Sequence, residues 1–308
     1  MSKFYPVILY PPLILKFLAQ NSISPLKNPC YKPTQDHSQI KNNYYINQNN
    51  WLPNILIYVF FISIGFIIPC SLILLSPLWL VIIAWALIGL GIFCACTISY
   101  TKLNNEKIAN YQTSTQTEKE AILHQSQHED KLRCWLTGKI LQPIGLSNAT
   151  IGVSEKAFYR VLQRVFGTIT QGVAFENPQF SYPYSADFVL IHPSSLSIDI
   201  EIDEPYVGDT KAPHHCINQG KDDIRNKFFT NSNWVVIRFS EKQVVKYPHS
   251  CCKAIAKVIA QVTGDRSYLN RLQPIPDLPP EPMWTIKQAK KWAKEDYRKT
   301  YLPLYLYQ

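Results

Sequence analysis

The chain has no charged residue between positions 42 and 101, although its 308 residues include 31 lysines and arginines and 22 aspartates and glutamates. An uncharged and mostly apolar stretch of this length excludes a wholly soluble globular protein. It also excludes a disordered chain, which needs low hydrophobicity and abundant charge. The averaged composition therefore hides two different parts, one suited to a membrane and one suited to water.

Several familiar functional patterns are absent as well. The eight cysteines form no CxxC pair and no cysteine–histidine ligand spacing, and there is no Walker loop and no Ser/His/Asp order. These absences argue against a zinc finger, a P-loop nucleotidase and a serine hydrolase. We interpret all eight cysteines as reduced, which suits a cytosolic location for the soluble part.

Two apolar runs within the uncharged stretch predict a transmembrane hairpin over residues 51–101. The runs 54–75 and 78–98 would reach about 33 and 31 Å as helices, against a hydrocarbon core of about 30 Å. Lysines lie on both outer flanks, which predicts both termini on the cytoplasmic side. The alternative is a buried pair of core helices, but two such runs exceed what a domain of this size can bury. The expected protein is thus an integral membrane protein with two spans.

The rest of the chain divides by composition. The expected parts are a cytoplasmic N-terminal tail (1–50), a helical stalk (102–146), a compact domain (147–264), and a proline-rich connector with a C-terminal amphipathic helix (265–308). That last helix could dock on the compact domain, lie on anionic lipid or contact phosphates. The net charge of +9 is spread over these parts. The compact domain itself is nearly neutral, so charge alone is a weak indication of nucleic-acid binding.

Hydrophobic periodicity predicts an α/β fold for the compact domain. The expected elements are helices over 154–166, 218–230 and 248–263 and strands over 186–191, 196–203 and 234–239. A short turn at 192–195 would join the first two strands into an antiparallel hairpin. The order is α-β-β-α-β-α, with a mixed central sheet flanked by helices.

The informative cluster lies in this hairpin. Asp199, Glu201 and Asp203 are spaced at i, i+2 and i+4, so their carboxylates share one face of a strand. Asp187 would lie opposite Glu201, with Cβ atoms about 5 Å apart. Such carboxylates repel one another unless a cation neutralises them, and a hard divalent cation with oxygen ligands is suited to do so. The competing interpretation is a solvated acidic strand face.

The domain resembles the PD-(D/E)XK nuclease superfamily, in the branch related to very-short-patch repair endonucleases. The similar segments are SEKAFYRVL (154–162), ADF (186–188), IEID (200–203), DDIRNKFF (222–229) and WVVIRF (234–239). They span about residues 150–260, a third of the chain. Each segment alone is weakly specific, and the resemblance rests on their order and spacing. It implies a restriction-endonuclease-like core and Mg²⁺-dependent hydrolysis of phosphodiester bonds.

The resemblance also implies roles for individual residues. Asp187, Glu201 and the carbonyl of Ile202 would hold Mg²⁺ (or Mn²⁺), and Glu155 would contribute through a water. His214 or His215 would act as general base or phosphate contact; an exposed polar turn is the alternative. The supporting residues would be Asp199, Asp222, Arg225 and Arg238. Asp222 and Arg225 have the spacing of a local helix pair, and Arg238 needs an acidic partner, for which Asp203 or Asp222 is expected.

One departure from the family pattern affects the functional prediction. Asp203 stands where the superfamily normally has a lysine. The related branch tends to have Asp at this position and to use histidine, and the candidates to substitute for the lysine are Lys211, Lys221 and Lys227. Two functions therefore remain open. The first is a membrane-anchored nuclease acting on DNA or RNA at the cytoplasmic face. The second is a catalytically inactive nuclease fold that serves as a membrane-tethered interaction or nucleic-acid-binding module. The expected partners are the lipid bilayer and DNA or RNA, and no protein partner is indicated.

Overall fold

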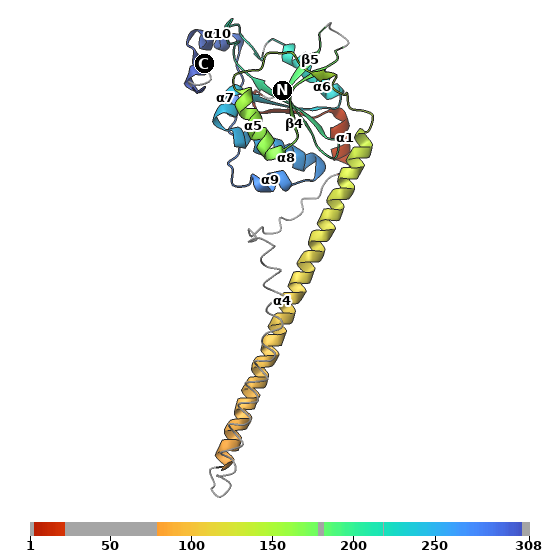
Figure 1. Cartoon of the computed structure of the whole chain (residues 1–308), viewed down its shortest axis with the longest axis vertical. Helices are drawn as coiled ribbons and strands as arrows, with labels where there is room; N and C mark the ends of the chain where they lie inside the picture. Colours follow the sequence, from red (N-terminus) through yellow and green to blue (C-terminus); the bar gives the residue numbers. More distant parts are fainter. Residues whose placement is uncertain (1–2, 22–78, 178–181, 218, 304–308) are drawn as a thin grey trace. The chain divides into compact units, whose positions relative to one another are not determined.

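A six-stranded mixed sheet forms the centre of the larger of two units in the computed structural model, which describes residues 3–21, 79–177, 182–217 and 219–303 (Figure 1). This unit comprises Met1–Ser24 and Ala121–Gln308, and the other comprises Pro25–Glu120. The sheet thus joins chain segments from both sides of the uncharged stretch.

The strands of this sheet follow a non-sequential order. They are β2 (Val7–Leu9), β7 (Val235–Ser240), β6 (Ser197–Asp203), β5 (Tyr184–Ile191), β4 (Ile169–Phe175) and β3 (Gly145–Leu146). Strands β6 and β7 are parallel, because the helix between them returns the chain to its starting edge, and the other neighbours are antiparallel. A separate two-stranded sheet pairs β1 (Phe4–Tyr5) with β8 (Glu281–Pro282).

Helices cover both faces of the sheet. Helices α5 (Glu155–Phe166) and α8 (Pro248–Thr263) pack against one face, in a core that includes Phe158, Ile200 and Ile259. Helix α6 (Lys221–Asn231) packs against the other face through Phe229. Every residue of β6 is buried, because both of its faces are covered. The mixed sheet flanked by helices confirms the expected fold class.

The predicted hairpin forms with the expected register. Phe188 pairs with Ile200 and Val189 with Asp199, which leaves Asp187 beside Glu201. The turn closes where His192 accepts from the Ser195 N–H at 2.8 Å and donates to the Leu196 carbonyl at 2.9 Å. The capping box at Ser240 and Gln243 is also present, at the start of α7 (Glu241–Lys246).

The expected element order misses three of the six strands of this sheet, β2, β3 and β4. Residues 169–175, expected to be coil, form β4, so within residues 147–264 three strands rather than two precede α6. Gly172 interrupts this strand with a φ of +62°, a conformation that glycine adopts at little cost, and it weakens the alternating pattern that identifies a strand. The short β3, placed in the expected stalk, pairs with β4.

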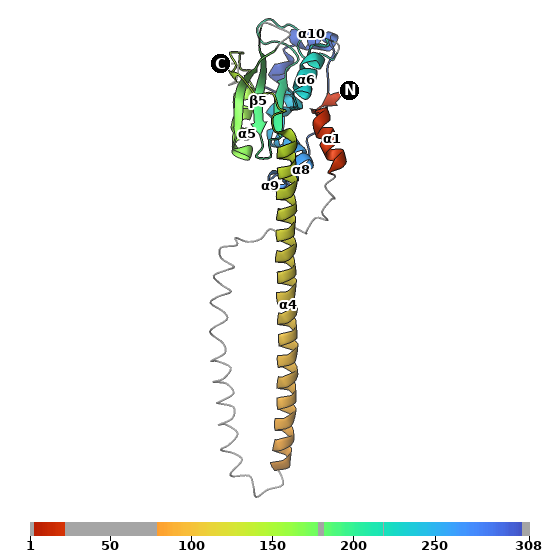
Figure 2. The same cartoon turned by 90° about the vertical axis from the view of Figure 1, so that its right-hand side faces the viewer.

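The prediction of an N-terminal tail is wrong for residues 4–20, because these residues are folded. They form β1, β2 and α1 (Pro12–Gln20), and β2 occupies a sheet edge beside β7. Both views show α1, in red, next to the end of α4 that adjoins the sheet (Figure 1, Figure 2). Phe17 makes ring contacts there with His128 and Trp135, at centroid distances of 5.0 and 6.0 Å. Pro11 is the N-cap of α1 and Pro12 its first residue, positions where proline is tolerated.

One described helix is apolar and long enough to cross a membrane. Helix α4 (Trp79–Leu136) contains the second expected span and continues without a break through most of the expected stalk. The first expected span, 54–75, lies outside the described residues. Only one of the two expected spans is therefore found.

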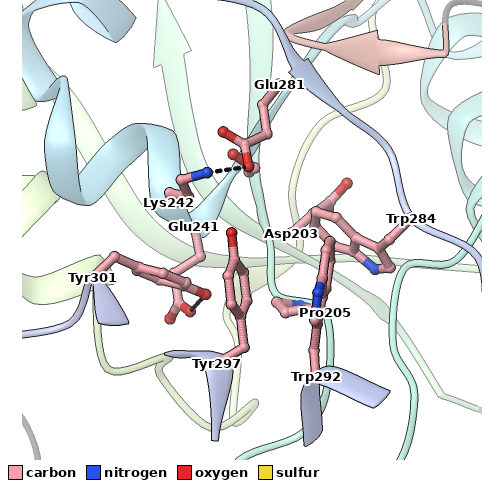
Figure 3. Close-up of a pocket in the computed structure, with 10 residues that line it drawn as sticks. Asp203, Pro205, Glu241, Lys242, Glu281, Trp284, Trp292, Tyr297 and Tyr301 are labelled. Atoms are coloured by element: carbon pink, nitrogen blue, oxygen red, sulfur yellow. Dashed lines mark hydrogen bonds and ion pairs between the residues drawn. The ribbon is translucent and has the colours of Figure 1, made fainter. Parts of the chain in front are cut away.

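The C-terminal segment docks on the folded unit. After α9 (Ser267–Arg271), helix α10 (Ile286–Lys294) buries Ala289, and the 3₁₀ helix η1 (Tyr297–Thr300) follows. Figure 3 shows Tyr297 between the side chains of Trp292 and Tyr301. The cavity that these aromatic residues line beside Asp203 and Glu241 has a volume of only about 10 Å³. That volume holds about one water molecule, so the segment closes this side of the sheet.

We expect the N-terminal segment to be essential to the stability of the fold. Replacing Phe17, which is 1% exposed, by Ala should lower the free energy of unfolding by about 3–5 kcal/mol, because it leaves a cavity between α1 and α4. The matched control Leu15→Ala removes a 52% exposed side chain from the same helix and should change stability by less than about 0.5 kcal/mol. Urea unfolding of the full chain in detergent measures both. Equal effects would mean that α1 does not pack as described.

Candidate functional site

The three acidic residues of β6 lie on a buried strand face. Asp199 is 0% exposed, Glu201 4% and Asp203 1%. A solvated acidic strand face is therefore excluded. Alternation explains the arrangement: Ile198, Ile200 and Ile202 point into the core beneath α5 and α8, so the carboxylates point to the side covered by α6.

Asp187 joins these carboxylates from the neighbouring strand. Its Oδ2 accepts a hydrogen bond from the Ile202 N–H at 2.8 Å, and its own N–H donates to Glu201 Oε1 at 3.4 Å. Burial, followed by the charges of Glu201 and Glu155, raises the pKa of Asp187 well above its usual value. The residue as a whole is only partly buried.

Glu155, expected to point inward from the first helix, does so. Its Oε1 accepts from the Gly152 N–H at 2.5 Å, and its Oε2 accepts from Gln171 on β4 at 3.2 Å. Gly152 allows this close approach, because a Cβ there would lie 2.8 Å from Oε1. Burial raises the pKa of Glu155, and these two hydrogen bonds only partly oppose the effect.

Arg225 neutralises Glu201 instead of pairing with its helix neighbour. Its Nη2 bonds both Glu201 Oε1 and the Ser185 carbonyl, and its guanidinium lies over the Phe229 ring at 5.2 Å. Burial would raise the pKa of Glu201, but the charges of Arg225 and Arg238 outweigh burial and lower it. The expected pair between Asp222 and Arg225 is wrong, because both side chains reach down to the sheet.

Arg238 is buried in the middle of β7 and has the acidic partners expected for it. Its Nε and Nη2 donate to the two oxygens of Asp203 at 3.0 and 2.5 Å. Its Nη2 also donates to Asp222 Oδ1 at 3.1 Å, and its Nη1 to Asn226 Oδ1 at 3.2 Å. Both predicted partners, Asp203 and Asp222, are thus confirmed. The N-terminal Tyr5 adds a hydroxyl bond to Asp203 at 2.8 Å.

The histidine pair lies beside this network. His215 Nδ1 is 3.0 Å from Asp222 Oδ1 and 3.3 Å from Asp203 Oδ1, while His214 Nδ1 is 3.1 Å from Glu204 Oε1. Burial would lower the pKa of His215, but the charge of Asp203 and the bond to Asp222 raise it to about 9. His215 is therefore protonated at neutral pH. It can contact a phosphate but cannot accept a proton there, so its expected role as general base is not supported.

None of the expected substitute lysines enters the site. Lys211, Lys221 and Lys227 are exposed, and Lys211 pairs with Asp296 at 2.8 Å. The positive charge comes from Arg225, Arg238 and His215. Carboxylates still outnumber these three cations; they are Glu155, Asp187, Asp199, Glu201, Asp203, Glu204 and Asp222.

The excess negative charge gathers around Asp187 and Asp199. Neither oxygen of the fully buried Asp199 receives a hydrogen bond from the described residues. Burial and the charge of Glu201 raise the pKa of Asp199 well above its usual value. The site thus holds more carboxyl groups than cations to neutralise them. An all-oxygen donor set with surplus negative charge fits Mg²⁺ or Mn²⁺, with Asp187, Glu201 and Glu155 as the candidate ligands.

Sequence reasoning missed three members of the site. Glu204, Asn226 and Tyr5 were not candidates, although Glu204 directly follows the acidic strand. The position of Glu204 was a usable signal, because it extends the acidic run by one residue. Nothing in the sequence indicated that Tyr5, 198 residues before Asp203, would reach the same carboxylate.

No protein-family model, curated protein or solved structure matches the chain.

We expect the protonation of His215 to make stability depend on pH. Its folded pKa of about 9 exceeds the ordinary 6.5, so its contribution is complete below pH 6.5 and is lost as pH rises through 9. Without divalent metal, unfolding free energy should fall by on the order of 3 kcal/mol between about pH 6 and about pH 10. His215→Gln should remove most of this slope, whereas His249→Gln, at an exposed site, should keep it. If the His215→Gln variant keeps the same pH dependence of the unfolding free energy as the parent protein, the dependence does not come from His215.

Proposed function

We propose that the folded unit is a divalent-metal-dependent phosphodiesterase that cleaves nucleic acid, and that the apolar stretch anchors it in a membrane. The observation that carries this proposal is the excess of carboxyl groups over cations around Asp187, Asp199 and Glu155, where the buried Asp199 receives no hydrogen bond from the described residues. A purely structural sheet gains nothing from this arrangement, because burying unpaired carboxyl groups costs stability.

The candidate metal ligands are Asp187, Glu201 and Glu155, with the carbonyl of Ile202 as a further candidate. A bound Mg²⁺ would supply a nucleophilic water of lowered pKa and would stabilise the charge that develops on the phosphorus oxygens. The Ile202 N–H and the strand pairing fix the orientation of Asp187.

The chain's own cations take the part of the superfamily's lysine in this proposal. Arg225 pairs with Glu201, and Arg238 pairs with Asp203 of β6 and Asp222 of α6. The protonated His215 and the 44% exposed side chain of His214 face the same loop, where they would contact a phosphate. Asp203, fully engaged by Arg238 and Tyr5, would then act as a positioning residue rather than as a metal ligand.

A catalytically inactive module is the second candidate, and the ion pair between Arg225 and Glu201 favours it. A guanidinium on that carboxylate competes directly with a metal. The two functions differ in their response to Arg225→Met. An active site should bind Mg²⁺ in the parent protein, whereas an inactive module should bind Mg²⁺ only after the guanidinium is removed.

Replacing a candidate ligand should abolish Mg²⁺ binding without destabilising the fold. Asp187→Asn and Glu201→Gln should each reduce Mg²⁺-dependent plasmid nicking by at least about 100-fold and abolish Mg²⁺ binding measured by calorimetry. Asp187→Asn should also raise stability slightly in chelator, since it removes carboxylate repulsion. Asp209→Asn, in an exposed loop, is the matched control. Unchanged Mg²⁺ binding in both ligand variants would place the site elsewhere.

We infer two membrane crossings with both termini on the cytoplasmic side. Strand β2 pairs with β7, so residues 3–21 and 121–303 belong to one folded unit on one side of a membrane. The chain between them must then cross an even number of times. Since α4 offers one candidate span, the apolar run at 54–75 supplies the other. The flanking lysines orient this hairpin.

Reporter fusions test this topology. Reporters at Gln308 and near Asn50 should both indicate the cytoplasm, and one inserted between Ser76 and Pro77 should indicate the opposite side. Opposite sides for the first two would overturn the proposal and would also be incompatible with the pairing of β2 and β7.

A further inference from the structure

The geometry points to a second metal site of different chemistry, formed by Glu204, His214 and His215, that binds a nitrogen-preferring transition metal ion such as Zn²⁺. One ligand atom from each of these residues lies within 4.8 Å of the others. Glu204 Oε1 is 3.1 Å from His214 Nδ1, and Glu204 Oε2 is 3.9 Å from His215 Nε2. Two imidazoles and one carboxylate form a common protein ligand set for Zn²⁺.

A self-bonded loop brings the three residues together. The loop that follows β6 folds back on itself, with an isolated bridge between Tyr206 and Pro213 and a bond from the Val207 N–H to the Ala212 carbonyl. The His214 N–H then donates to the Pro205 carbonyl at 3.0 Å, which returns His214 to Glu204. The ligands thus come from the two ends of one closed loop.

A contact from outside the loop also fixes the backbone of His214. Trp284 Nε1 donates to the His214 carbonyl at 2.8 Å, and Trp284 itself is 3% exposed against the Tyr5 ring. The two imidazole rings are in contact, with centroids 3.8 Å apart. A site held this rigidly loses little entropy when it binds a metal.

An outer carboxylate orients His215 in the manner usual for a metal ligand. Asp222 and Asp203 both lie within 3.3 Å of Nδ1, and carboxylates only accept, so their positions assign a proton to Nδ1. Arg238 Nη2 also lies 3.0 Å from Nδ1, and its two hydrogens are shared among Nδ1, Asp203 and Asp222. Nε2 therefore faces Glu204 and is the atom that a metal would bind, displacing a proton. A carboxylate behind the far nitrogen is typical of histidine ligands.

This site differs from the proposed magnesium site in donor type. Asp187, Glu201 and Glu155 offer only oxygen, whereas Glu204, His214 and His215 offer two nitrogens and one carboxylate group. Nitrogen donors favour Zn²⁺ over Mg²⁺. Three protein ligands leave a coordination position for water, as in open zinc sites. The inference does not depend on the proposed nuclease function.

Co²⁺ and Zn²⁺ titration of the full chain in detergent tests the site. We expect one equivalent of Co²⁺ to give a visible absorption band, one equivalent of Zn²⁺ to displace it, and Zn²⁺ to raise the melting temperature. His214→Gln, a partly exposed position, should weaken Zn²⁺ binding by about 100-fold or more, because it removes a ligand. Asp222→Asn should weaken it by about 10-fold through His215.

Three controls separate the possible outcomes. His249→Gln, in an exposed position at the start of α8, should bind Zn²⁺ as the parent does and excludes general surface binding. Asp187→Asn, which removes a candidate magnesium ligand, should also retain Zn²⁺ binding. The Zn²⁺ measurement therefore tests this site independently of the proposed magnesium site. A parent that binds neither Co²⁺ nor Zn²⁺, or a His214→Gln variant that melts as the parent and binds Zn²⁺ equally well, would overturn the inference.

Discussion

The buried guanidinium of Arg238 is the constraint on which the rest of the domain depends. An unpaired charge in the middle of a covered sheet would be prohibitively costly, so its neighbours must supply acceptors. Asp203 on β6 takes two of its donors, while α6 supplies Asp222 and Asn226. These bonds relate β6, β7 and α6 to one another. The same carboxylates hold His215, so the loop after β6 takes its position from this charge as well.

Local patterns in the sequence predicted the parts of the fold that local physics determines. The hairpin of 186–203 and the helix at 248–263 both form where expected, because each depends on neighbouring residues. Strand β4 was missed because Gly172 disrupts its alternation. The folding of residues 4–20 was missed because their partners, β7 and the end of α4, are far away in the sequence. Periodicity identifies a face, but it does not identify what covers that face.

The candidate site shows the same division between local and distant information. Alternation correctly placed Asp199, Glu201 and Asp203 on one face and Asp187 beside them. It could not show that the face is buried, nor that Arg225 would leave Asp222 for Glu201. An exposed helix pair is worth only a few tenths of a kcal/mol, whereas a buried carboxylate without a cation costs several. The larger energy decides where Arg225 points.

The pairing of β2 with β7 has a consequence for how the chain is made. A ribosome releases Tyr5 long before Asp203, which follows 198 residues later, so the N-terminal strand has no partner during most of synthesis. Its exposed edge is open to wrong pairing throughout that time. An apolar stretch retained in a bilayer would keep the waiting strand close to the remainder of the domain as it emerges. Such tethering raises the local concentration of the two halves, and turns a slow search between distant segments into a short-range one.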